Sequence, residues 1–193
     1  MIAFLNPVAC RGRLLMLVLA LWPVRAVAAE GEVEVIVGPD YGVAPMGSRR
    51  LAGYGLGAEL SYGWDDEIAV SIGGHSITHP KDQGSSPFDV SFVHGGLRYA
   101  IDVLAVTPYV RADAARYLER PRSENATAFN DWSLQGSVGL SWRAWPHTNV
   151  GAEVRFHDLA ARFSEQPTYV SLWLFASWVV ASHARDPDLP DGS

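Results

Sequence analysis

The sequence predicts an all-β protein, specifically an eight-stranded antiparallel up-and-down transmembrane β-barrel. Three observations lead to this prediction. The amino terminus has the composition of an export signal, eight later segments alternate apolar and polar residues, and the connections between those segments alternate between long and short. No segment beyond residue 30 has the 3.6-residue periodicity of an amphipathic helix. We therefore divide the chain into residues 1–29, a barrel domain at 30–182 and a polar tail at 183–193.

Residues 1–29 are predicted to be a secretory signal peptide. Arg11 and Arg13 precede an apolar run from Leu14 to Trp22, and small residues at 26–29 follow. This order is that of an export signal, and the run is shorter than the roughly 20 residues that span a bilayer. We expect cleavage after Ala29, or alternatively after Ala28. The only cysteine, Cys10, lies inside the signal, so the mature chain would have neither disulfides nor a thiolate nucleophile.

The composition narrows the class of protein further. Hydrophobic residues make up 48% of the chain and charged residues 19%, and the formal net charge is -6. A nucleic-acid-binding protein would be expected to carry a basic patch, so this charge argues against one. Lys81 is the only lysine, whereas soluble proteins of this size usually cover their surface with Lys and Glu.

Two segments show the strand pattern most clearly. In Leu51–Trp64 one face is apolar and aromatic, while the other holds glycines, Glu59 and Ser61. In Trp132–Arg143, Trp, Leu and Val share one face, and Ser, Gln, Gly and Arg143 share the other. Period-2 alternation of this kind predicts strands with two unlike faces.

Six further segments follow the pattern less cleanly. The sequence suggests a phase change near Val93, which a β-bulge would explain. The last segment is apolar on both faces, so its phase stays open. The six are Glu32–Gly38, Glu67–His75, Phe88–Ile101, Thr107–Leu118, Asn149–Asp158 and Thr168–Ala181.

The seven connections are predicted to alternate in length. A membrane barrel has short turns at its periplasmic end and longer, hydrophilic loops at its extracellular end. An even number of strands also returns both termini to the same side. The first connection is long, the second short, and this alternation continues to a long seventh. In chain order the connections are Pro39–Arg50, Asp65–Asp66, Ser76–Pro87, Asp102–Val106, Glu119–Asp131, Ala144–Thr148 and Leu159–Pro167.

Polarity decides which face should point outward. The less apolar face is mostly Gly and Ser with scattered Glu and Arg, which suits the narrow interior of an eight-stranded barrel. The other face is bulky and apolar, and aromatic residues near strand ends suggest girdles at the membrane interfaces. These are Trp64, Tyr99, Tyr109, Trp132, Trp142 and Trp145. The alternative is a secreted soluble barrel of the lipocalin kind, which would bind an apolar ligand.

Some of these strands resemble a known family. Gly96–Tyr99 with Pro108–Arg111, and Gly136–Gly139 with Asn149–Arg155, are similar to strand passages of the OmpX-like and OmpA-like small outer-membrane barrels. The resemblance implies location in the cell outer membrane, insertion by the barrel-assembly machinery, contact with outer-membrane lipids and a structural or surface-interaction role. The sequence departs from the family at Arg111 and Asp113, where glycine is common. It also departs in the tail at 183–193, where the family ends on an aromatic residue.

Strand parity directs several charged residues into the predicted lumen. Buried charges must be paired and hydrogen-bonded to be tolerated, so we predict a salt-bridge network there. The network could gate a narrow pore or plug the barrel, and the small lumen of eight strands favours a plug. The predicted members are Glu59, Arg98, Arg111, Asp113, Arg143, Glu153 and Arg155, with Glu32 and Glu34 on the same face.

No catalytic, cofactor or metal site is predicted. His75 and His79 have a spacing that joins ligands only on a helix, and the segment after His75 is expected to be a loop, with Asp82 nearby. Ser76 beside His75 is the closest approach to a nucleophile–base pair, and no third partner can be assigned. We expect His94 and His157 on inward faces as satisfied polar residues. A barrel enzyme acting on lipids remains an alternative to a monomeric barrel without catalysis.

Overall fold

The computed structural model describes residues 30–46, 49–81, 86–101, 106–123, 127–159 and 169–182. These residues form a single closed barrel of antiparallel strands, which confirms the predicted fold class. The signal peptide at 1–29 and the tail at 183–193 lie outside the described residues. The strands are β1 Glu32–Met46, β2 Arg49–Gly63, β3 Ile68–His79, β4 Phe88–Ala100, β5 Val106–Pro121, β6 Phe129–Trp145, β7 Thr148–Leu159 and β8 Tyr169–Ser182.

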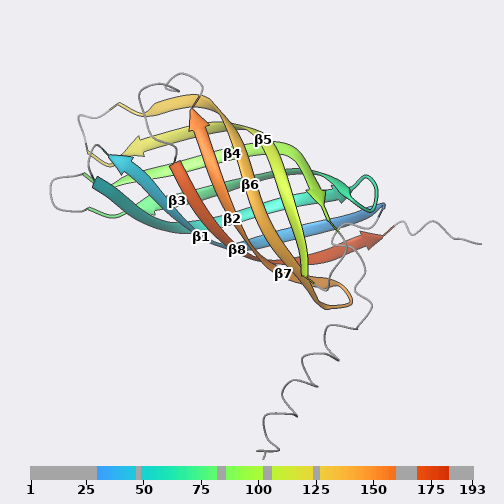
Figure 1. The fold of residues 1–193 in the computed structure, drawn as a ribbon. Helices are drawn as coiled ribbons and strands as arrows, with labels where there is room; N and C mark the ends of the chain where they lie inside the picture. Colours follow the sequence, from blue (N-terminus) through green and yellow to red (C-terminus); the bar gives the residue numbers. More distant parts are fainter. Residues whose placement is uncertain are drawn as a thin grey trace, which may run out of the picture.

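Each strand pairs with its neighbours in the sequence, and β8 pairs with β1 to close the barrel. The closing ladder begins at Glu32↔Ser182, so the start of β1 and the end of β8 lie side by side at one end (Figure 1). We call this the terminal end and the opposite end the loop end. Closure leaves no free sheet edge, which is the condition for a sheet to cross a bilayer. Among the described residues, no helix is long and apolar enough to cross a membrane.

Several strands are longer than the sequence predicted. β1 continues to Met46 and β2 starts at Arg49, so the expected long connection Pro39–Arg50 is wrong and only residues 47–48 separate the strands. The prediction stopped at Pro39 because proline removes a ladder hydrogen bond. In the structure, the pairing of β1 with β8 is interrupted at Gly38 and Pro39, and the Trp173 indole donates to the Gly38 carbonyl there over 3.2 Å.

The connection after His75 was also predicted too long. Ser76 to His79 continue β3 and pair with the first residues of β4, ending at His79↔Phe88. β5 likewise extends to Pro121, and β6 already starts at Phe129. At the other connections, those at the loop end are still longer than those at the terminal end. Residues 80–87, 122–128 and 160–168 separate strands at the loop end, whereas 64–67, 101–105 and 146–147 separate them at the terminal end.

The bulge predicted near Val93 is absent from β4. Its register with β3 and β5 runs without a shift, and the inward positions stay in phase from Phe88 to Ala100. What changes is the chemistry of the inward face, which is apolar from Phe88 to Phe92 and carries the polar side chains of His94 and Arg98 farther along. Register shifts occur instead at Val33/Glu34 and at Arg143/Trp145.

Strand β8 has a defined phase that the sequence left open. Tyr169, Trp173 and Phe175 point inward and are buried, while Leu172 and Leu174 point outward. Both faces are apolar because aromatic rings on this strand fill the barrel interior.

The outer face of the barrel is apolar with aromatic residues toward both ends. Five of the six predicted girdle residues are exposed on it, among them Trp64 at 68% and Trp132 at 59%. Tyr109 is the exception and lies inside the barrel at 3% exposure. The prediction for Tyr109 is wrong because its parity is that of Arg111, which faces the lumen.

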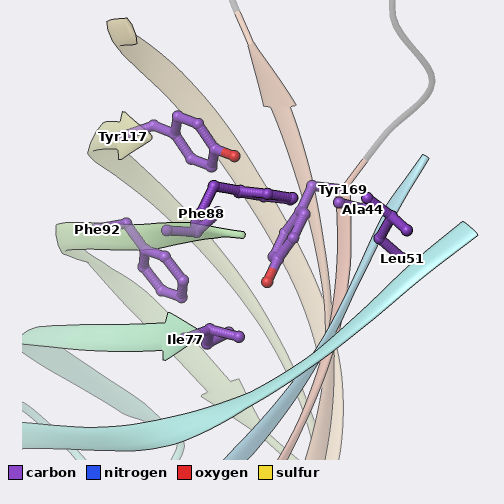
Figure 2. Close-up of a cluster of buried hydrophobic side chains, with 8 residues drawn as sticks. Ala44, Leu51, Ile77, Phe88, Phe92, Tyr117 and Tyr169 are labelled. Atoms are coloured by element: carbon purple, nitrogen blue, oxygen red, sulfur yellow. The ribbon is translucent and has the colours of Figure 1, made fainter. Parts of the chain in front are cut away.

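Two hydrophobic clusters lie inside the barrel. The larger one is at the loop end, where side chains from several strands converge on the barrel axis (Figure 2). The smaller one lies nearer the terminal end, around Trp173 and Phe175. The loop-end cluster consists of Ala44, Leu51, Ile77, Phe88, Val90, Phe92, Tyr117 and Tyr169, with Phe129 packed against it.

Candidate functional site

The candidate site is the charged interior between these clusters. The barrel wall directs every second residue inward, and the seven charged residues predicted to face the lumen come from five strands. All but Arg143 are buried. Glu59 lies on β2, Arg98 on β4, Arg111 and Asp113 on β5, Arg143 on β6, and Glu153 and Arg155 on β7.

Arg111 is the hub of a central group. Its Nη1 donates to Glu59 Oε2 over 2.6 Å, and its Nε donates to Asp113 Oδ2 over 2.7 Å. Its Nη2 contacts His94 Nδ1 at 2.9 Å. A guanidinium has no acceptor, so His94 accepts through Nδ1 and is the tautomer that carries its proton on Nε2. Arg111 thus joins β2, β4 and β5 through one side chain.

Arg155 makes the second half of the central group. It donates to Glu153 and to His75 Nε2, and its Nη2 lies 3.7 Å from Glu59 Oε2. Its guanidinium also lies over the Trp173 ring, 4.4 Å from the centroid. Glu59 therefore stands between two arginines, as a buried carboxylate requires if it is to remain charged.

His75 connects this group to a residue that the sequence analysis missed. Because Arg155 donates to His75 Nε2, the imidazole carries its proton on Nδ1 and donates it to Asp40 Oδ2 over 2.8 Å. The ring stacks on Phe92, with centroids 4.8 Å apart. Asp40 was assigned to a loop, and extending the alternation of Glu34 and Ile36 past Pro39 would have placed it inward.

A second polar group fills the terminal end. Glu34 accepts from Arg98 Nη2 over 3.3 Å and also from the Asn149 amide. Arg143 donates to Glu32 over 3.1 Å and to Asn149 over 3.1 Å. Between the two groups, the Tyr109 hydroxyl donates to Glu153 Oε2 over 2.7 Å. Charged and polar side chains thus share the interior with the smaller hydrophobic cluster from the centre to the terminal end.

The pair considered for catalysis, Ser76 and His75, does not form, and a second Ser–His contact in the lumen lacks a third partner among the described residues. Ser76 points outward and contacts the Ser91 hydroxyl at 3.3 Å, whereas His75 points inward. His157 Nε2 lies 3.2 Å from Ser171 Oγ, but both residues are fully buried and His157 Nδ1 has no partner among the described residues. Neither pair supplies the nucleophile, base and orienting acid that acyl or phosphoryl transfer needs.

The histidines do not form the pair discussed for a metal either. His79 stacks on Phe88, with centroids 4.4 Å apart in the loop-end cluster, while His75 belongs to the central group. Asp82 lies outside the described residues. Glu59, His75 and His94 do offer ligand atoms within 4.8 Å of one another. Glu59 Oε2 already accepts from Arg111 and His75 Nε2 from Arg155, and the charges of these two arginines would repel a cation.

The family of this chain follows from its sequence. Residues 14–169 match the family described as outer membrane protein beta-barrel domain. The chain belongs to this family. It is therefore an outer-membrane β-barrel, and the apolar outer face is the surface expected to contact lipid. No curated protein matches the sequence at a significant level.

Solved structures of other outer-membrane barrels share this fold at low sequence identity. Neisserial surface protein A is 14% identical, with a TM-score of 0.65, 78% of this chain covered and 99% of that chain covered. Ail, the attachment invasion locus protein of Yersinia pestis, is 15% identical, with a TM-score of 0.57 and coverages of 78% and 98%. The amino-terminal barrel of Pseudomonas aeruginosa OprF is 12% identical, with a TM-score of 0.52 and coverages of 77% and 97%.

Proposed function

We propose that this outer-membrane barrel is a closed, non-conducting scaffold whose role is exerted at the cell surface by its loop end. The single observation that supports this most is the filled interior. The central group around Arg111 and Arg155 occupies the middle of the lumen, and the loop-end cluster covers it on the loop side. A solute would have to displace paired charges and packed rings, which is costly in a low-dielectric interior.

The outer face argues against the soluble alternative. A lipocalin-type barrel directs its bulky apolar face inward and hydrates the other, whereas here Leu56, Ile72 and Leu134 are at least 60% exposed. We also infer that the protein is not an enzyme, because Ser76 and His75 point to opposite sides of the wall, and no described acid accepts from His157. Two similar structures carry names that refer to surface roles, neisserial surface protein A and the attachment invasion locus protein.

Export and assembly complete the proposal. We infer that residues 1–29 are removed as a signal peptide, that the barrel-assembly machinery inserts the chain, and that the barrel remains monomeric among outer-membrane lipids. The polar lumen needs no second copy to satisfy its charges, because the six buried members of the network are paired within one chain.

A planar-bilayer recording tests the scaffold proposal. Protein is purified from the outer membrane, where its mass also reports whether cleavage follows Ala29, and its folding is verified by a heat-dependent shift on a detergent gel. We expect no single-channel steps from the folded protein. Stable conductance steps that grow with salt concentration would show an open lumen and contradict the proposal.

A further inference from the structure

Strand β5 changes character on its outer face as it approaches the loop end. Its outward positions are Val110, Ala112 and Ala114, followed by Arg116 and, beyond Leu118, Arg120. Both arginines are exposed. Arginine is costly in hydrocarbon, so its appearance on an outward row indicates where the apolar zone ends.

The neighbouring strand locates this boundary relative to the bilayer. The outward row of β6 is apolar between Trp132 and Trp142, both exposed. Their separation corresponds to roughly 33 Å of strand, which at a tilt of about 40° spans about 25 Å, the usual height of the apolar band. Trp132 therefore marks the membrane interface on the loop side. The register Arg116↔Trp132 puts Arg116 at that interface.

Neither arginine is neutralised by the described part of the protein. The Arg116 guanidinium lies over the Trp132 ring, 5.4 Å from the centroid, with no described carboxylate in ion-pair range. Arg120 is opposite Asp89 in the register, but that carboxylate accepts from Arg122 over 2.7 Å and 2.8 Å, and from Thr78 over 2.8 Å. Within the described residues, these two outward positive charges thus have no ion-pair partner at the level of lipid headgroups.

We propose that Arg116 and Arg120 bind the phosphates of a phosphorylated glycolipid in the outer leaflet, with Trp132 beside its acyl chains. A guanidinium offers a planar fork of donors that matches a phosphate, and stacking on an indole keeps Arg116 flat against the barrel wall. The two residues are separated by roughly 13 Å along the strand, which suits a sugar headgroup phosphorylated at both ends. This inference rests on the membrane orientation used in the proposed function.

Binding of diphosphorylated lipid A to the full mature chain in detergent, followed by native mass spectrometry, tests the site. We expect the double variant R116Q/R120Q to bind at least about tenfold more weakly than the wild type, because each surface arginine contributes to attraction of anionic headgroups. R50Q is the matched control, since Arg50 is also exposed, on β2, but outside the site. Equal binding by the double variant and the wild type would overturn the proposal.

Two further lipids separate the phosphate and glycolipid parts of the proposal. With dephosphorylated lipid A, wild type and double variant should bind equally weakly. With phosphatidylglycerol, the wild type should bind more weakly than with diphosphorylated lipid A, and equal binding would reduce the site to a general anion contact and refute the glycolipid assignment. Each variant must keep the heat-dependent gel shift. An open pore in the bilayer recording would contradict the proposed function without affecting this outcome.

Discussion

At the scale of single residues, the interior is stable because each buried charge meets an opposite charge or a hydrogen-bond donor. Arg155 is the clearest example of a buried charge that depends on its partners. It donates to Glu153 and lies near Glu59, and its guanidinium plane covers the Trp173 ring. Burying two charges costs several kcal/mol for each ion, so such pairs add little net stability when intact. Removing one partner leaves the other charge buried and unpaired, and that is strongly destabilising.

Replacing Arg155 with methionine should therefore destabilise the barrel by about 3–5 kcal/mol, despite the similar apolar length of the side chain. The measurement is the midpoint of thermal unfolding in detergent, followed by loss of the heat-dependent gel shift. The matched control is R50M, which removes an exposed arginine and should leave the midpoint nearly unchanged. Unchanged midpoints for both R155M and E153Q would refute the network as a structural element.

Strand parity predicted the inward position of most charged residues, because a strand alternates faces whatever its neighbours are. Strand parity alone did not predict the positions of Asp40 and Tyr109. Asp40 was missed because Pro39 was taken as the end of β1, and the local gap in the β8 ladder that accommodates proline is not visible in the sequence. Tyr109 had the correct parity but was assigned to the girdle, because a ring near a strand end is compatible with both positions.

At the scale of elements, the glycines of β2 have a specific structural reason. A Cβ added at Gly57 would lie 2.1 Å from the His75 ring, so the inner wall of β2 must be bare for the imidazole to reach Asp40. The sequence showed that Gly53, Gly55 and Gly57 share a face. It did not show that Gly53 and Gly57 lie against the rings of His79 and His75, because the β2–β3 register was unknown. The phase of β8 could not be predicted for a similar reason, since Trp173 and Leu174 are both apolar.

Gly57→Ala should thus destabilise the protein, because the His75 ring must move and its hydrogen bonds to Asp40 and Arg155 are disturbed. Overpacking of this kind costs about 1–3 kcal/mol. Gly136→Ala is the matched control, because a Cβ at Gly136, which faces outward on β6, would meet nothing within 4 Å. Thermal unfolding of the two variants side by side gives the comparison. A midpoint for G57A equal to that of G136A would contradict the packing described for His75.

At the scale of the whole molecule, the barrel resembles an inverted soluble protein. Its polar and charged side chains converge on the axis, and its large apolar side chains face outward. This arrangement is favourable only if the outer face contacts lipid, because exposed apolar area in water is penalised by about 25 cal/mol per Å². The two faces of the barrel wall should therefore have different surroundings at similar depths, lipid outside and packed side chains inside.

Fluorescence quenching by brominated lipids tests this claim most directly. One single-tryptophan protein keeps only Trp173, and the other has Trp173 replaced by Phe and a tryptophan introduced by Val138→Trp. The registers Val138↔Val154 and Val154↔Leu172 place position 138 on the outer face two strands away from Leu172, which at a strand tilt of about 40° is a difference in depth of roughly 6 Å. We predict strong quenching of the tryptophan at 138 and little quenching of Trp173 in bilayers with brominated acyl chains. Equal quenching of both, or quenching of neither, would show that the outer face and the interior do not differ in their contact with lipid.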